Sequence, residues 1–422
     1  MTGAVERIRG DGLAPASGLA ERFQSTRALS LALAAPLSDA DATLQSMPDA
    51  SPAKWHLAHT TWFWETFLLR DHLPDHAPFD ERFGFLFNSY YQTEGPRHSR
   101  VARGMLARPS IDEIRDWRAH VDAAMTPLLE RAELVPLIEL GIAHEQQHQE
   151  LLLTDIKHAF FQNPLGPQVY AAAPKPAHVE LVETPRARVG LEWIDHPGGI
   201  VRIGHTGPHF AFDNEGPVHD VLLQPFALAS TLVTNAEWAD FIADGGYYTP
   251  ALWLSDGWAW VQGEGIEAPL YWRDDAWFTH IGWQPRNPSA PVTHISYFEA
   301  DAFAQWAGAR LPTEFEWEAV AAGHDPTASN QLDRGGPIAP AGDNTLFGDC
   351  WQWTRSAYLP YPRFRTAEGA VGEYNGKFMS GQFVLRGASC ATPRGSSRAS
   401  YRNFFYPHQR WQFTGLRLAK DI

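Results

Sequence analysis

Two histidine pairs in this 422-residue chain have the spacing of side chains that share one face of a helix. His144 and His148 are four residues apart in the segment HEQQH, and His56 and His59 are three apart in WHLAHTTW. Residues three or four apart in a helix lie on the same side of it. HEQQH therefore predicts two imidazoles that reach one metal ion, and the other segment can supply a third. The spacing does not choose between His56 and His59.

The identity of the metal is open from the residues alone. HEQQH matches the HExxH pattern of zinc proteases, in which Glu145 would be the general base. The extended form of that pattern fails, because Leu151 and Thr154 stand where a glycine and a third histidine belong. Three neutral imidazoles with no protein anion suit Fe(II) that awaits an anionic ligand such as a thiolate, and they also suit zinc. A pair of surface histidines without a metal is the plainer alternative.

Helices must position these histidines, and the first part of the chain has the pattern for them. Ser110 with Glu113 three residues later is a capping box at the start of one of these helices. The predicted helices cover residues 19–34, 55–69, 111–132 and 134–161. Four helices with one long connection predict a helical bundle, whose core is a usual metal site.

The second part of the chain differs in its composition and residue pattern. Five prolines lie between residues 163 and 188, which forbids a helix and favours a connector. Short β-like pieces rich in Gly and Trp follow, with helices predicted at residues 235–244 and 297–306. We therefore expect an α+β chain with a helical bundle at 15–165, a connector at 166–188 and an irregular domain at 189–422.

Composition narrows the class of protein. There are 34 Lys and Arg residues against 49 Asp and Glu, a net charge of −15, which argues against a nucleic-acid partner. No run of 18 apolar residues predicts a membrane span, and the N-terminus lacks the apolar stretch of a secretion signal, so we expect a cytoplasmic protein. Cys350 and Cys390 are the only cysteines. Two cysteines are too few for a disulfide framework, and we expect both to be buried small residues.

Several segments together resemble the ergothioneine-type sulfoxide synthases, which are non-heme iron enzymes that act on hercynine (trimethylhistidine). In the first part these segments are DASP (49–52), WHLAHT (55–60), NSYY (88–91), GPRH (95–98) and HEQQHQE (144–150). In the second part RLPTEFEWE (310–318), GDCWQWT (348–354) and RGAS (386–389) resemble signatures of formylglycine-generating enzymes. The resemblance implies an N-terminal DinB-like four-helix bundle and a C-terminal formylglycine-generating-enzyme-like domain with a C-type-lectin-like fold.

The resemblance also implies roles for the histidines and tyrosines of the first part. It makes His59, His144 and His148 the ligands of Fe(II), with O2 as cosubstrate, and leaves His56 as a helix neighbour. The resemblance also implies that Tyr90 or Tyr91 is catalytic, because both stand where the family has an active-site phenol. A phenol can give a proton or a hydrogen atom, although simple packing is the alternative for both tyrosines.

Four further residues of the first part are implied to bind substrates. Gln147 would hydrogen-bond the substrate imidazole. Arg97 and Arg100 offer guanidinium forks that can bind a carboxylate of the sulfur donor, and we favour Arg100. Asp49 would pair with the donor's ammonium group, or it would serve as a helix cap before Pro52.

A second aromatic and basic cluster, RNFFYPHQRW at 402–411, resembles the segment with which the family's C-terminal domain covers the iron. Phe404 and Phe405 are implied to hold the trimethylammonium group by cation–π attraction, although such residues are more often core. Asn403 and Arg410 are implied to bind substrate beside them.

The expected activity is O2-dependent formation of a C–S bond at C2 of the hercynine imidazole, with cysteine as the donor. The segments GSSR (395–398) and YPHQ (406–409) depart from the family's commonest form, so a selenoneine synthase that uses a selenosugar is the close alternative. The partners would be hercynine and a thiol or selenol donor. Thr392 and Ser397 stand where formylglycine-generating enzymes have cysteines, so cysteine oxidation is not expected. A zinc hydrolase that uses Glu145 and a non-catalytic binding module are the alternatives from other classes.

Overall fold

A helical bundle forms the first half of the computed structural model, as the sequence predicts. The structure describes residues 16–89, 91–171, 192–342, 345–366 and 375–422. The bundle consists of α1 (Ala16–Ala34), α3 (Ala53–Trp64), α5 (Ile111–Met125) and α6 (Val135–Phe161), with the short helices α2 (Asp39–Thr43) and α4 (Phe83–Phe87) beside them. The predicted helix 55–69 continues beyond α3 as a π-helix, Glu65–Arg70, and the predicted helix 111–132 ends in a 3-10 turn, Thr126–Leu128.

Local interactions explain where two of these helices lie. Ser110 and Glu113 form the predicted capping box at the start of α5, each side chain accepting the backbone N–H of the other. On α6, Gly141 packs directly against the indole of Trp64, and a Cβ at Gly141 would lie 2.5 Å from that ring. Glycine is therefore what allows α3 and α6 to approach closely at this level of the bundle.

The second half, residues 192–422 where described, is a mixed region of small sheets and short helices; we call it the second region. Its strands are β1 (Trp193–His196), β2 (Gly199–Ile203), β3 (His219–Leu223), β4 (Phe226–Ala229), β5 (Trp272–Arg273), β6 (Ala276–Thr279), β7 (Gly282–Pro285), β8 (Trp351–Ala357), β9 (Phe383–Gly387), β10 (Asn403–Phe405), β11 (Thr414–Gly415) and β12 (Ala419–Asp421). They form sheets of order β1-β4-β12, β10-β9-β8-β11, β2-β3 and β5-β6-β7. The expected α+β class is confirmed.

Four helices accompany these sheets in the described part of the second region. They are α7 (Asn235–Ala243), α8 (Ser255–Glu264), α9 (Tyr297–Trp306) and α10 (Glu314–Ala321). The predicted helices 235–244 and 297–306 are confirmed as α7 and α9. The helices α8 and α10 were not predicted from the sequence, although Thr313 and Glu316 form a capping box at the start of α10.

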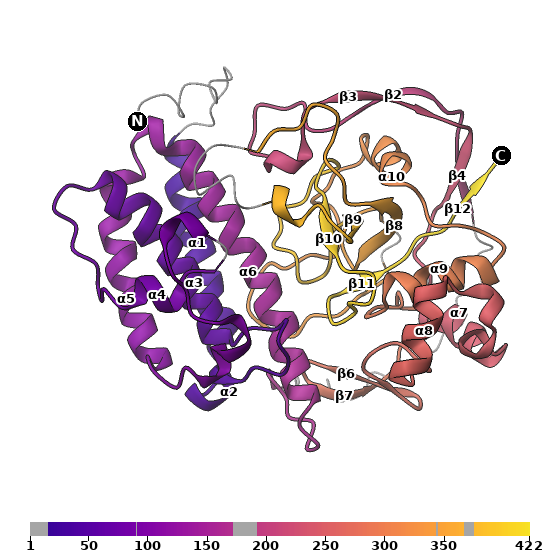
Figure 1. Ribbon diagram of the computed structural model, residues 1–422, viewed down its shortest axis with the longest axis horizontal. Coiled ribbons are helices and arrows are strands. Elements are labelled where there is room, and N and C mark those ends of the chain that lie inside the picture. Colours follow the sequence, from indigo (N-terminus) through magenta and orange to yellow (C-terminus); the bar gives the residue numbers. More distant parts are fainter. Residues whose placement is uncertain (1–15, 90, 172–191, 343–344, 367–374) are drawn as a thin grey trace, which may run out of the picture.

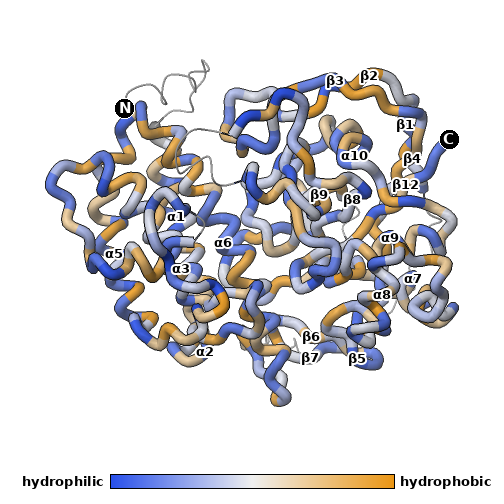
Figure 2. Tube along the Cα trace, in the orientation of Figure 1, coloured by the Kyte–Doolittle hydropathy of each residue, from blue (hydrophilic) through white to orange (hydrophobic). Residues whose placement is uncertain are grey.

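The two halves meet along α6, which lies on the side of the bundle that faces the second region (Figure 1). Hydrophilic residues lie along this helix (Figure 2), and many of them are buried. Glu150 illustrates how they are satisfied, because its carboxylate accepts hydrogen bonds from Trp351 (2.7 Å), Ser389 (2.6 Å) and Thr392 (2.9 Å) of the second region. Polar contacts of α6 therefore join the two halves.

Most of the predicted connector, residues 172–188, lies outside the described residues. Its first residues are described, and Val169 and Tyr170 are buried with their backbone N–H groups directed to the His280 carbonyl. None of the helices in the described part of the chain combines the length and the apolar character that a membrane-spanning segment needs.

Candidate active site

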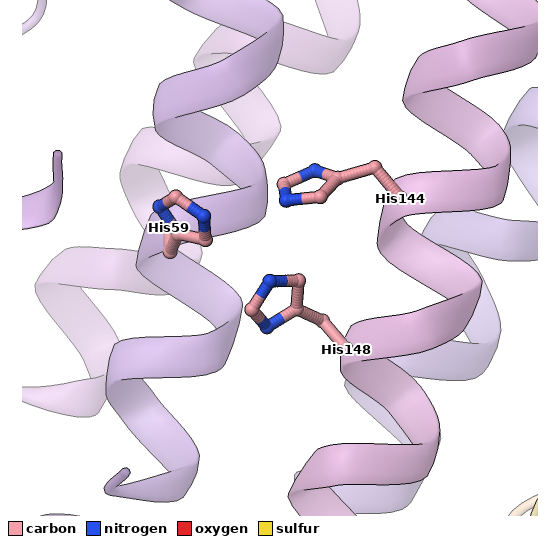
Figure 3. A group of neighbouring side chains, drawn as sticks. All are labelled: His59, His144 and His148. Carbon is pink, nitrogen blue, oxygen red and sulfur yellow. The ribbon is translucent and has the colours of Figure 1, made fainter. Parts of the chain in front are cut away.

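Three histidines converge inside the bundle. His59 on α3 and His144 and His148 on α6 point toward one another (Figure 3), and one ring nitrogen from each lies within 4.8 Å of the other two. His59 and His144 are buried, and His148 is partly exposed. One ion between these nitrogens would contact all three side chains, so the arrangement fits a metal with three imidazole ligands.

The protein holds the other nitrogen of two of these rings. Nδ1 of His59 lies 2.6 Å from the Phe87 carbonyl oxygen, which can only accept, so Nδ1 carries the proton and Nε2 keeps a lone pair. Nδ1 of His148 lies 2.8 Å from Nδ1 of His56. His56 thus lies beside one member of the triad and is not part of it. This contact distinguishes His56 from His59, which the sequence spacing could not do.

Burial keeps the triad uncharged. Burial lowers the pKa of His59 and of His148 well below the usual range, and the neighbouring imidazoles lower both further. Burial also lowers the pKa of His144 to about 4, although the nearby Glu145 carboxylate opposes this. All three rings are therefore neutral at neutral pH, the form in which an imidazole binds a metal.

The Glu145 carboxylate is not placed to act as a general base, which argues against the zinc-hydrolase alternative that used it. Its fully buried carboxylate faces an ionic cluster inside the bundle. Four groups donate to it, namely Arg27 (3.0 Å), Trp64 (2.9 Å), Ser30 (2.6 Å) and Arg118 (2.7 Å). Burial alone would raise its pKa, but the two guanidinium groups outweigh this and hold the pKa well below its usual range. The carboxylate is thus fully occupied in holding α6 against its neighbours.

A cavity of about 260 Å³ adjoins the triad and is lined by both halves of the molecule. Seven of the predicted substrate-binding and catalytic residues line it: Asp49, Tyr91, Arg100, Gln147, Asn403, Phe404 and Phe405. Since these residues are up to about 350 positions apart in the chain, the fold brings together most of the residues that the sequence analysis selected. The predicted Tyr90 lies outside the described residues.

The bundle supplies the wall next to the triad. Tyr91 is buried, and its ring packs against Trp62 and Phe67, with centroids 5.4 Å and 5.2 Å away. Gln147 on α6 donates from Nε2 to the hydroxyl of Tyr401 in the second region, at 2.7 Å. Gln147 is therefore held in a fixed orientation at the cavity by a residue of the other half.

One end of the cavity carries charged groups. The Arg100 guanidinium donates to the Asp49 carbonyl oxygen, and the Asp49 carboxylate accepts a hydrogen bond from Gln409 at 3.4 Å. Asp49 does not cap a helix, because Pro52 occupies the N-cap of α3. An exposed carboxylate and a guanidinium at this end can pair with the two charges of an amino acid.

Aromatic rings line the side formed by the second region. Phe404 on β10 stacks on Tyr358, with ring centroids 4.1 Å apart, and lies 6.0 Å from Phe378. The neighbouring Asn403 uses its side-chain oxygen to accept the Phe404 backbone N–H. Phe404 and Phe378 both line the cavity, so this side offers aromatic rings to a ligand.

Two predicted substrate-binding residues are elsewhere. Arg97 is exposed and is not among the residues that line the cavity. Arg410 also does not line it, because its guanidinium donates to Glu299 (3.0 Å) and to the Ala268 carbonyl (2.9 Å). The buried Glu299 carboxylate would be costly to leave without a positive partner, and its pairing with Arg410 accounts for this difference from the prediction.

The structure adds a residue that the sequence analysis missed. Arg103 is buried at the cavity, its guanidinium lies 3.3 Å from the Trp55 ring centroid, and it donates to Ser51 (2.9 Å) and Ser89 (3.0 Å). The available signal was its position three residues after Arg100 in the same basic segment. Arg103 places a fixed positive charge beside the triad.

Comparisons with known proteins agree with this division into two halves. Residues 22–152 match the DinB superfamily model, and residues 182–344 match the sulfatase-modifying factor enzyme 1-like domain. The hercynine oxygenase of Mycolicibacterium smegmatis is 35% identical over 430 residues, which cover 91% of this chain and 94% of that protein. The hercynine oxygenase of Mycobacterium tuberculosis is 32% identical, with the same coverage. A formylglycine-generating enzyme of Streptomyces coelicolor is 35% identical over 41% of this chain and 58% of its own.

Proposed function

The chain belongs to the hercynine oxygenase family, the ergothioneine-type sulfoxide synthases, and we propose that it is a non-heme Fe(II) enzyme. In this proposal O2 is the oxidant, and a C–S bond forms at C2 of the hercynine imidazole with cysteine as donor. The observation that carries the proposal is the group of three converging histidine imidazoles at the wall of a cavity lined by both halves.

The triad would hold the ion through His59, His144 and His148. These ligands bring no negative charge and do not fill the coordination sphere, so an anionic sulfur ligand and O2 could both bind. Fe(II) at this position would supply the redox chemistry with O2 that no side chain can supply. The contribution of the protein is to bind, orient and shield the reactants.

Hercynine has a trimethylammonium group beside a carboxylate at one end and an imidazole at the other, and the cavity has groups suited to the trimethylammonium and to the imidazole. Gln147 would hydrogen-bond the imidazole, with its amide held by Tyr401. The ring face of Phe404 would attract the trimethylammonium group, and such contacts contribute roughly 0.5–2 kcal/mol. Phe378 beside it extends the aromatic surface. The substrate would then lie with its ring toward the triad.

The donor and a proton source would use the bundle side. Arg100 would bind the carboxylate of cysteine and Asp49 its ammonium group, since both line the same end of the cavity. We assign proton or hydrogen-atom donation to a phenol, either Tyr91 at the cavity wall or Tyr90. The second region lines the opposite side of the cavity with β10 and Trp411, which would limit the access of bulk water to the reactants.

The test is turnover by the full chain reconstituted anaerobically with Fe(II). We expect O2 consumption that requires both hercynine and cysteine, a product of the mass of a C–S adduct, and loss of both signals in His144→Ala. Arg100→Gln should raise KM for cysteine and leave KM for hercynine nearly unchanged. Absence of O2 consumption with every thiol and selenol donor would refute the proposed function.

One observation favours a second candidate, a C–Se bond formed from hercynine and a selenosugar. The wall from the second region presents the amides Asn375, Gln382 and Gln409, and its only charged side chain among the described lining residues is Arg402. That guanidinium is already paired with Glu314, at 2.8 Å and 3.0 Å. A neutral, hydrogen-bonding wall suits a donor rich in hydroxyl groups. Turnover with the selenosugar and none with cysteine would establish this candidate instead.

A further inference from the structure

A chain of hydrogen bonds links the second region to one member of the triad. The Trp411 indole donates from Nε1 to Oδ1 of Asp155, at 3.0 Å. Oδ2 of Asp155 lies 3.1 Å from Nε2 of His56, and Nδ1 of His56 lies 2.8 Å from Nδ1 of His148. Trp411, Asp155 and His56 are all buried. These hydrogen bonds thus run from the segment between β10 and β11 of the second region, through α6 and α3, to the metal position.

The carboxylate at one end of these hydrogen bonds sets the direction of the first link. A carboxylate only accepts, so the Nε2 of His56 carries a proton that points to Asp155. In the neutral form of His56 this leaves the lone pair on Nδ1, which can accept the Nδ1 proton of His148. This leaves the lone pair of His148 on Nε2. The order of donors and acceptors therefore selects the tautomer of His148 that can bind a metal through Nε2.

The sequence spacing makes this chain of bonds a property of the two helices. His148 and Asp155 are seven residues apart on α6, two turns along the same face. His56 precedes His59 by three on α3, so both face α6. Asp155 is anchored independently, because Oδ2 also accepts the Ser51 backbone N–H at 2.8 Å. These contacts hold His56 between the carboxylate and the ligand.

We propose that His56 and Asp155 are positioning residues for the metal ligand His148, and that Trp411 of the second region completes their arrangement. This inference rests on the proposed function, because it requires a metal at the triad. It assigns to the second region a part in metal binding, although the triad itself lies wholly in the bundle. Partners of this kind change metal affinity by about 10- to 100-fold when they are lost.

The experiment measures the affinity of the full chain for Co2+ alone, by anaerobic titration against a chelator, with the visible spectrum of the bound ion as a second signal. His56→Leu removes the acceptor for His148, and we expect affinity to fall by about 10- to 100-fold with an altered spectrum. His56→Asn puts an amide oxygen near the position of Nδ1, and it should restore most of the affinity.

Trp411→Phe and Trp351→Phe form a matched pair. Each removes one indole donor of the second region from a carboxylate of α6, since Trp351 donates to Glu150 and Trp411 to Asp155. We expect Trp411→Phe to weaken Co2+ binding several-fold and Trp351→Phe to leave it unchanged. Thermal unfolding of the metal-free variants distinguishes loss of positioning from loss of folding.

The outcomes separate the two levels of the hypothesis. A wild-type chain that binds no Co2+ at the triad overturns both the proposed function and the positioning role. If a folded His56→Leu variant binds Co2+ as tightly as the wild-type chain does, the positioning role alone is overturned. Equal weakening by Trp411→Phe and Trp351→Phe overturns the part assigned to Trp411.

Discussion

Replacing Glu145 with glutamine removes the negative charge that Arg27 and Arg118 share inside the bundle. Both guanidinium groups and the carboxylate are almost completely buried, and two further donors, Ser30 and Trp64, also point at the carboxylate. The glutamine NH2 group would face a donor whichever way the amide turns. Loss of one partner of a buried ion pair costs roughly 3–5 kcal/mol, because the remaining charges lose their compensation. At about 2–4 °C per kcal/mol, the melting temperature should fall by roughly 10 °C.

The assay is thermal and denaturant unfolding of wild type, Glu145→Gln and Glu139→Gln at neutral pH. Glu139 is the matched control, because it also lies on α6 and pairs with an arginine of α1, Arg22, at 3.0 Å. That pair is partly exposed, so its loss should change stability by less than about 1 kcal/mol. A Glu145→Gln variant that is as stable as wild type but inactive would make Glu145 a catalytic base and refute the reasoning.

Two further predictions concern buried groups of α6. Lys157 contacts His294 at 2.7 Å, and burial lowers the pKa of Lys157 from 10.5 to about 7. Between these pH values the unfolded chain still binds the proton that Lys157 of the folded chain has released. Wild-type stability should therefore rise relative to Lys157→Met, by up to about 1.4 kcal/mol per pH unit, between pH 7 and 10; parallel curves from denaturant unfolding would contradict this. Gly141→Ala forces a methyl group against Trp64 and should cost about 1–3 kcal/mol, whereas Gly263→Ala on α8 meets open space and should not destabilise; equal effects in thermal unfolding would argue against the close approach.

Two members of the histidine triad were predictable because the information that places them is local. The four-residue spacing of His144 and His148 places both on one face of a helix, and α6 has the length to hold them. The choice of His59 over His56 needed the family resemblance, since both face α6. The structure explains the difference, because His56 is already bonded to His148 and Asp155.

The residues that were misjudged depend on contacts between distant parts of the chain. Glu145 fits the HExxH pattern, and only the positions of Arg27 and Arg118, 118 and 27 residues away, show that it is a structural carboxylate. Arg410 lies in the predicted cluster but pairs with Glu299, 111 residues earlier. The bond between Trp411 and Asp155 spans 256 residues. No local pattern reports such pairings.

The second region was harder to predict in detail than the bundle. Its strands are short, and several pair with strands far away in the sequence, as β4 does with β12. The helix α8 contains Gly257 and Gly263, which weaken a helical pattern. Gly257 is needed because Phe298 packs against it, a contact that the sequence does not show.

The most direct test of the account is the iron content of the full chain after anaerobic reconstitution with ferrous iron and removal of unbound metal. We expect the wild-type chain to retain one Fe(II), and His59→Ala and His144→Ala, each folded as judged by circular dichroism, to retain none. Wild-type protein that holds no iron, or folded variants that retain it fully, would contradict the claim that these imidazoles form the metal centre.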